Sequence, residues 1–282
     1  MRLLKSFLII AAGAYIALVC ALFVMQRTLL YRPNVSDMEA MRATMPGVER
    51  LVLKTSDGES IVAWHSPPRE GEPLFIYLHG NAANLSARNL RLMSFARQGW
   101  GFLAVSYRGY GGSTGSPTEE GLIADAEAAY AKARELGLPP ERIFLFGESL
   151  GTGVAIALAA KHPVRGLALE APYSSIADVA SSIYWYAPVR LLLRDQFLSD
   201  ERVKSVRAPI LIMHGDDDRV VPIRFGEKLF AAANEPKEFL RITSGGHQPL
   251  DDPRAQKQLV EWVGEVMRGL TPPSSPAPDR SP

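Results

Sequence analysis

The stretch FGESLGTG, residues 146–153, holds a serine among glycines in a spacing that serves two different chemistries. As GxSxG, it would present Ser149 as a nucleophile on a sharp turn between a strand and a helix. As GxxxGxG, it would be a glycine-rich loop around the pyrophosphate of a dinucleotide. Glu170 follows about twenty residues later, where a dinucleotide-binding fold places an acid for the ribose hydroxyl. The stretch alone leaves both chemistries open.

Residues further along the chain favour the nucleophile. HGDDDRVVP, residues 214–222, offers an acid, and SGGH, residues 244–247, offers a histidine, so Ser, Asp and His follow in the order of hydrolases with a GxSxG turn. Any of Asp216, Asp217 and Asp218 could supply the carboxylate. A dinucleotide loop would follow the first strand of its fold, whereas FGESLGTG follows the fifth predicted strand. No tyrosine has a lysine four residues later, as short-chain dehydrogenases require.

Acyl transfer explains why three such residues are needed. A serine hydroxyl is a weak nucleophile near neutral pH, so an imidazole must take its proton and a carboxylate must orient the imidazole and stabilise its cation. The oxyanion that forms needs backbone N–H donors. The Leu150 amide at the start of the next helix would be one donor. The second would come from the loop after PLFIYLHG, and we assign it to the Asn81 amide, with Ala82 as the neighbouring alternative.

These residues can meet only where strand ends share one edge of a sheet. From about residue 47 to 269, apolar runs alternate with helical patterns, which predicts one α/β domain with a mainly parallel eight-stranded sheet and helices on both faces. The first two runs, joined by SDGE, are typical of a hairpin. The predicted strands lie in VERLVLKT, SIVAWHS, PLFIYLHG, GFLAVSYRG, RIFLFGES, GLALEAP, PILIMHGDDD and KEFLRITSGGH, and the predicted helices are residues 84–98, 118–136, 149–161, 224–233 and 251–268.

One long segment, residues 173–205, interrupts this alternation. It separates two predicted strands by more than a crossover needs, and insertions of this kind at strand ends commonly form lids. We therefore expect a small helical lid. Its stretch IYWYAPVRLLL, residues 183–193, is rich in aromatic and aliphatic side chains, as expected of an apolar acyl pocket and equally of the core of a lid.

The two ends of the chain differ from the body. Residues 7–25 carry no charge and are long enough to cross a bilayer as a helix. No small-x-small site closes this run, so we expect a retained anchor, residues 1–27, rather than a cleaved signal peptide. Basic residues on the two sides of this run nearly balance. The charge of the amino terminus adds a slight preference for an N-terminus inside the cell, so we expect the body, residues 28–270, outside the cytoplasm. Residues 271–282, TPPSSPAPDRSP, are expected to form a disordered tail.

Composition excludes several classes of protein. The net charge of +1 and the lack of basic runs with aromatic residues argue against nucleic acid as a partner. The single cysteine, Cys20, lies in the apolar N-terminal run, so the body has no intrachain disulfide. There is no HExxH, and the acidic run that starts at Asp216 has valines where a calcium loop needs an oxygen ligand and a glycine. We expect neither a metal nor a cofactor.

Other titratable residues have plainer roles. His79 and His214 each precede a glycine at a strand end and are predicted to be buried structural residues. His65, at the end of a hairpin strand, is predicted to lie at the surface. Glu148 and Glu170 are predicted to support the site or to be exposed charges.

Together, these motifs resemble those of the α/β-hydrolases. More narrowly, the chain is similar to the membrane-anchored bud-emergence branch, related to the α/β-hydrolase-domain depalmitoylases and, more distantly, to serine aminopeptidases. The five blocks that carry the resemblance are LHGNAANL at 78–85, YRGYGGSTGSPTEEGL at 107–122, GESLGTGVA at 147–155, HGDDDRVVP at 214–222 and GGH at 245–247. By the register HGxxDxxVP, the resemblance implies Asp218 as the acid, with Ser149 as nucleophile and His247 as base. Arg108, in the second block, would help to build a loop bordering the pocket.

The resulting expectation is a membrane-anchored serine hydrolase, of the carboxylesterase or thioesterase type, that forms an acyl-enzyme on Ser149. A peptidase like the aminopeptidases would need a group to bind a free amine, for which Glu148, Glu170 and Asp178 are the candidates. A catalytically silent, membrane-bound interaction protein is the alternative from another class. The chain lacks an N-terminal cysteine cluster like that of the depalmitoylases, which argues against an acylated protein as substrate.

Overall fold

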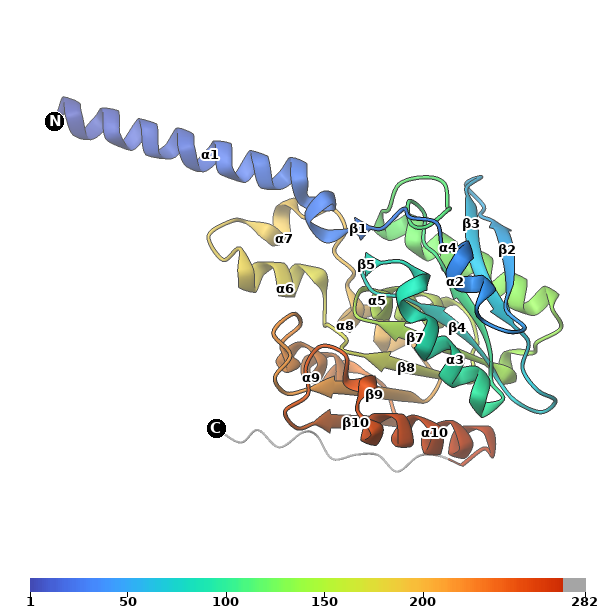
Figure 1. Ribbon diagram of the computed structural model, residues 1–282. Helices are drawn as coiled ribbons and strands as arrows, with labels where there is room; N and C mark the ends of the chain where they lie inside the picture. Colours follow the sequence, from blue (N-terminus) through green and yellow to red (C-terminus); the bar gives the residue numbers. More distant parts are fainter. Residues whose placement is uncertain (271–282) are drawn as a thin grey trace.

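The computed structural model describes residues 1–270, and an eight-stranded sheet forms its centre (Figure 1). The strands are β2 (Glu49–Lys54), β3 (Ser60–Ser66), β4 (Leu74–Leu78), β6 (Gly101–Val105), β7 (Ile143–Glu148), β8 (Gly166–Glu170), β9 (Ile210–Gly215) and β10 (Lys237–Ile242). Their order across the sheet is β10-β9-β8-β7-β4-β6-β3-β2. β3 pairs antiparallel with both β2 and β6, and the other neighbours are parallel. The predicted mainly parallel sheet is therefore confirmed.

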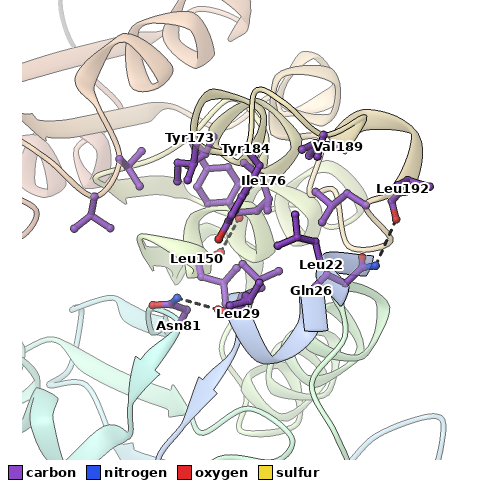
Figure 2. A pocket seen from close by; sticks show the side chains of 18 of the residues that line it. Leu22, Gln26, Leu29, Asn81, Leu150, Tyr173, Ile176, Tyr184, Val189 and Leu192 are labelled. Atoms are coloured by element: carbon purple, nitrogen blue, oxygen red, sulfur yellow. Dashed lines mark hydrogen bonds between the residues drawn. The ribbon is translucent and has the colours of Figure 1, made fainter. Parts of the chain in front are cut away.

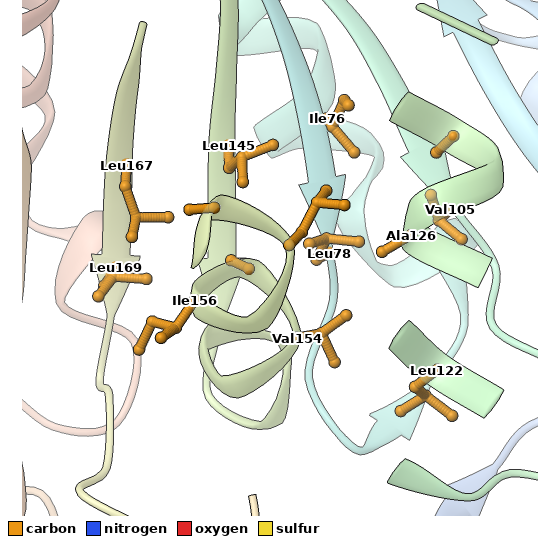
Figure 3. Packing of buried hydrophobic residues seen from close by; sticks show 14 of the residues in the cluster. Ile76, Leu78, Val105, Leu122, Ala126, Leu145, Val154, Ile156, Leu167 and Leu169 are labelled. Carbon is orange, nitrogen blue, oxygen red and sulfur yellow. The ribbon is translucent and has the colours of Figure 1, made fainter. Parts of the chain in front are cut away.

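Helices cover both faces of this sheet. They are α3 (Asn89–Gln98), α4 (Glu119–Glu135), α5 (Leu150–Lys161), α9 (Ile223–Ala232) and α10 (Pro253–Met267). Successive strand residues point to opposite faces, so Ile76 and Leu78 of β4 pack towards α4 and α5 (Figure 3). Phe75 precedes Ile76 and points to the opposite face of the sheet. There it packs against Phe95 of α3, with ring centroids 4.9 Å apart. Burial on both faces explains why the inner strands read as continuous apolar runs.

The predicted helices are confirmed to within a few residues. The one expected over 84–98 begins with a 3-10 turn, η1 (Leu85–Arg88), before α3. The Asn84 side chain accepts a hydrogen bond from the Ser86 amide at 3.0 Å and so caps this turn. Two further 3-10 turns, η2 (Pro140–Arg142) and η4 (Pro249–Asp251), precede β7 and α10.

The segment 173–205, called here the insertion, lies between β8 and β9 and contains short helices only. These are α6 (Ile176–Ile183), α7 (Val189–Leu192), α8 (Ser199–Arg202) and the 3-10 turn η3 (Val203–Ser205). α6 begins at the cap residue Ser175, whose side chain accepts from the Asp178 amide. The expected helical character is present, and its role as a lid stays a prediction.

A long helix, α1 (Arg2–Leu30), projects from the body (Figure 1). It is long and apolar enough to cross a membrane by length and composition, and it contains the predicted run 7–25. The buried Tyr31 joins it to the two-residue strand β1 (Arg32–Pro33), which pairs with β5 (Ala82–Ala83). β1, β5 and the short helix α2 (Glu39–Ala43) were not predicted, because elements this short show no periodicity. The tail predicted for 271–282 lies outside the described residues.

Candidate active site

Three side chains expected to act together do meet at the carboxyl edge of the sheet. Ser149 follows β7, Asp218 follows β9 and His247 follows β10. The His247 Nε2 atom lies 3.0 Å from the Ser149 hydroxyl, and its Nδ1 atom lies 2.8 Å from Asp218 Oδ2. This geometry permits the hydroxyl to donate to the imidazole while the imidazole donates to the carboxylate.

Ser149 lies on a strained turn between β7 and α5. Its φ of 49° falls in the left-handed region, which non-glycine residues occupy at a cost of about 1–3 kcal/mol. The turn brings two segments of backbone together: a Cβ atom added at Gly151 would lie 2.0 Å from the Leu78 carbonyl oxygen, and one added at Gly147 would lie 2.7 Å from Thr152 Cα. The glycines of GxSxG are therefore needed for close approach, and the turn holds the hydroxyl above the strand edge.

Asp218 is held as a carboxylate by several donors. Its Oδ1 atom accepts from the Val220 amide at 2.8 Å and the Val221 amide at 2.9 Å. Its Oδ2 atom lies 3.4 Å from His214 Nε2 in addition to the contact with His247. Burial alone would raise the pKa of Asp218, but the hydrogen bonds from the two histidines and from the backbone outweigh it and hold this pKa well below its ordinary range.

Two backbone segments border Ser149 where an oxyanion would form. Leu150 is the first residue of α5, so its amide has no acceptor within the helix. On the other side, the Asn81 carbonyl accepts from Tyr110 Oη at 2.7 Å and from the Arg32 amide at 3.0 Å, which fixes that loop. Asn81 and Ala82 both line the same cavity as Ser149 and Leu150, so either amide of the loop remains available as the second donor.

Ser149 opens into an apolar cavity of about 390 Å³. Its walls come from α1, the loop after β4, the start of α5 and the insertion. Figure 2 shows Leu22, Gln26 and Leu29 of α1 on one side and Ile176 and Val189 of the insertion on the other. A cavity of this size and lining suits an apolar small-molecule group.

Comparisons with known proteins agree with this architecture. The family model described as "alpha/beta hydrolase fold" matches residues 73–197. The human protein ABHD12B is 36% identical over 243 residues, covering 71% of this chain and 66% of that protein. The chain is an α/β-hydrolase. It is related to the ABHD serine hydrolases.

Other relatives of this α/β-hydrolase extend over most of its length. The uncharacterized protein Rv2307c of Mycobacterium tuberculosis is 38% identical over 225 residues, covering 79% of this chain and 80% of that protein. The lysophosphatidylserine lipase ABHD12 of Danio rerio is 31% identical over 234 residues, which cover 69% of this chain and 61% of that protein. Among solved structures, the Pyrococcus furiosus esterase Pf2001 superposes with a TM-score of 0.66 at 17% identity, covering 85% of this chain and 99% of that one, a likeness of fold.

Behind Ser149, the hydrolase buries Glu148, which is not the exposed charge that its sequence position also allowed. Its carboxylate accepts from Tyr77 Oη at 2.6 Å and from Arg88 Nε at 2.8 Å. Burial would raise the pKa of Glu148, but the arginines beside it lower this pKa below the ordinary value. The carboxylate thus stays ionised and holds η1, and through Arg91 also α3, to the end of β7.

Glu170 is fully buried in the same network, and this excludes it as an exposed acid for a ribose hydroxyl. Arg91 forms an ion pair with it, and the Leu250 amide donates to it at 3.0 Å. Burial raises the pKa of Glu170 above its ordinary value. Leu250 comes three residues after His247, so Glu170 ties the histidine loop to the sheet.

The buried histidines behave partly as expected. His79 and His214 are both fully buried, and each lies within hydrogen-bond distance of a backbone carbonyl, as predicted for structural residues. Burial lowers the pKa of His79 to about 4, so it is neutral near pH 7. The surface position predicted for His65 is wrong: its side chain is buried, because β3 is covered on both faces of the sheet.

Arg108 is held by two carboxylates away from the cavity lining. Its guanidinium binds the buried Asp125 at 2.9 Å and Asp57 of the first hairpin at 2.6 Å, and it is absent from the residues lining the described cavity. The expectation that Arg108 helps to build a loop bordering the pocket stays a prediction, and its own contacts hold that loop to α4 and to the first hairpin. Tyr110 of the same block does reach the site indirectly, through its bond to the Asn81 carbonyl.

The contribution of α1 to the cavity could not be found by sequence reasoning. Almost every residue of the run is apolar, so the pattern marks no face for packing. The one residue that could have indicated a contact between α1 and the body is Gln26, since an amide near the end of an apolar helix needs polar partners. Within residues 1–270, no group of three or more His, Cys, Asp or Glu side chains is placed to hold a metal ion.

Proposed function

We propose that this α/β-hydrolase is a membrane-anchored serine hydrolase that cleaves an ester or thioester through an acyl-enzyme on Ser149. One observation carries the proposal: a hydrogen-bonded series from Ser149 through His247 to Asp218 opens on an apolar cavity. Sequence order, strand-end positions and the strained turn at Ser149 are consistent with it.

In the first half of the proposed reaction, His247 Nε2 takes the proton of the Ser149 hydroxyl as Oγ attacks the carbonyl carbon. The Leu150 amide and the Asn81 amide donate to the oxyanion of the tetrahedral intermediate. Asp218 remains ionised and stabilises the imidazolium. The imidazolium then protonates the departing alkoxide or thiolate, and the acyl group stays on Oγ.

In the second half, water takes the place of the leaving group. His247 removes a proton from the water as its oxygen attacks the acyl carbon, and it returns that proton to Ser149 Oγ when the ester bond breaks. The free carboxylic acid leaves, and the hydroxyl and the neutral imidazole are restored.

The cavity and its surroundings support the proposed substrate class. The lining is mostly apolar, which suits an acyl chain, and a relative at 31% identity bears the name of a lipase acting on lysophosphatidylserine. The three acids considered for binding a peptide amine give no support to a peptidase. Glu148 and Glu170 are bound to arginines, and Asp178 is bound to Arg190 and Lys228.

The proposed organisation has three parts. Residues 1–27 would attach the protein to a membrane through α1, and residues 28–270 would form the hydrolase with its lid at 173–205. From the slight charge preference at the N-terminus, we infer that the body lies outside the cytoplasm. Accessibility of the body to an added protease in sealed vesicles tests this orientation.

The reaction itself is tested by intact-mass measurement of the detergent-solubilised full chain after treatment with a fluorophosphonate. We expect one adduct on Ser149, absent from Ser149→Ala and strongly reduced in His247→Ala. Ester turnover by Ser149→Ala should fall by about 10⁶-fold, as expected for loss of a nucleophile in a triad.

Ser182→Ala, on an exposed position of α6, serves as the matched control and should label and turn over like the wild type. Near wild-type hydrolysis by Ser149→Ala would exclude the proposed nucleophile. A folded full chain that neither labels nor hydrolyses esters would instead favour the silent interaction protein.

A further inference from the structure

One face of α1 belongs to the cavity rather than to the surroundings of the protein. The cavity-lining positions recur every three or four residues, so they form a single stripe along the last three turns of the helix. The stripe consists of Val19, Leu22, Phe23, Gln26, Leu29 and Leu30.

Specific polar contacts hold α1 in this position. The Gln26 side-chain oxygen accepts from the Arg194 amide at 2.7 Å, and Arg27 forms an ion pair with the buried Asp195 at 2.9 Å. Further along the helix, Tyr15 Oη donates to the Tyr186 carbonyl at 2.9 Å. All three partners lie in the insertion, so α1 and the insertion are bound together as two sides of one cavity.

The stripe gives the cavity a direction. Leu29 and Leu30 lie beside Asn81, next to Ser149, whereas Val19 lies eleven residues back along the helix. Eleven residues of α-helix rise about 16 Å. Ile176 and Val179 of α6 line the same space from the insertion. The cavity therefore extends from the hydroxyl along the helix and matches a linear apolar chain.

We propose that α1 is a wall of the acyl-binding site, so that the helix that attaches the protein to a membrane also selects the substrate by chain length. The inference rests on the proposed function and adds the ligand class: an ester whose acyl group is long, linear and apolar. The acyl chain would lie between the stripe of α1 and α6, with its carbonyl carbon at Ser149.

The test uses the full chain in detergent micelles and two p-nitrophenyl esters, acetate and dodecanoate. Leu22→Trp fills the cavity away from Ser149, so the ratio of kcat/KM for the dodecanoate to kcat/KM for the acetate should fall at least tenfold. Val24→Trp is the matched control, because Val24 lies on the same helix, 79% exposed and outside the stripe. It should change neither value by more than twofold.

Leu22→Ala is a second variant for the case that Leu22→Trp does not fold, because it removes volume without crowding the helix. It should shift the ratio of kcat/KM for the dodecanoate to kcat/KM for the acetate in the opposite direction to Leu22→Trp. Chain-length preference that is unchanged in both Leu22 variants overturns the inference, while leaving the serine hydrolase proposal intact. A wild-type protein that cleaves neither ester and takes no fluorophosphonate adduct contradicts the proposed function, and this inference fails with it.

Discussion

Among the three consecutive aspartates after β9, the surroundings of each side chain differ sharply. Asp218 turns inward, where two backbone amides and two histidines surround it. Asp216 instead accepts from the Ser244 amide at 2.7 Å, and Asp217 lies at the surface beside Arg219. The low pKa of Asp218 means that it remains a carboxylate throughout the neutral range, as a partner for an imidazolium requires.

Replacing this carboxylate tests its assignment. Asp218→Asn should lower kcat on a short ester by about 10⁴-fold, because an amide in this position favours the wrong imidazole tautomer and cannot stabilise the cation. Asp217→Asn should leave kcat within twofold, since its side chain faces solvent. Comparable losses in the two variants would argue that the run acts through its overall charge and not through Asp218.

Spacing in the sequence was enough to single out Ser149 and His247 but not the acid. The HGDDDRVVP run offers three identical side chains, and the one that meets His247 is identified only by a contact across 29 residues of sequence. Family register supplied the choice of Asp218. The buried partners of Glu148 and Glu170 could not be predicted for the same reason: Arg88 at the end of η1 and Arg91 on α3 lie about sixty to eighty residues away in sequence.

At the scale of elements, the junction of β7 and α5 is where sequence and geometry are most tightly linked. Gly151→Ala would place a Cβ atom 2.0 Å from the Leu78 carbonyl oxygen, and backbone cannot move away as a flexible side chain can. We expect this variant to lower the melting temperature by several degrees, because a loss of 1 kcal/mol shifts it by about 2–4 °C in domains of this size.

Gly264→Ala provides the control for this substitution. Its new Cβ atom would meet only the end of the Arg268 side chain at 3.4 Å, and alanine favours the α10 helix by about 1 kcal/mol. Thermal unfolding followed by circular dichroism should show opposite shifts for the two variants. Equal stability of both would mean that the turn at Ser149 relaxes freely.

Element prediction succeeded where periodicity and length were both present. The eight strands and five long helices each carry an apolar pattern over five or more residues. The strands β1 and β5 have two residues each, and their pairing joins positions fifty residues apart. No local sequence pattern therefore predicts these strands. In α1 the difficulty was the reverse: a uniformly apolar run hides which face meets the body.

For the whole molecule, the decisive question is whether α1 inserts into a membrane. If α1 spans a bilayer, the full chain should stay in the membrane pellet after washing with alkaline carbonate. Ile9→Arg combined with Ile16→Arg should release it, because each charge near the centre of a span costs about 2.5–3.5 kcal/mol. Both positions are exposed and outside the cavity stripe, so fluorophosphonate labelling should persist. Release of the unaltered chain would exclude a spanning helix.

The junction between α1 and the body leaves the helix little freedom to swing. Asn81 Nδ2 donates to the Leu30 carbonyl at 2.9 Å, Tyr31 is buried, and β1 begins at the next residue. A spanning helix joined in this way would keep Ser149 at a set height over the lipid. Such an enzyme would distinguish esters by their depth: a scissile bond held at the level of Ser149 would be reached, and the same bond held farther from the bilayer would not.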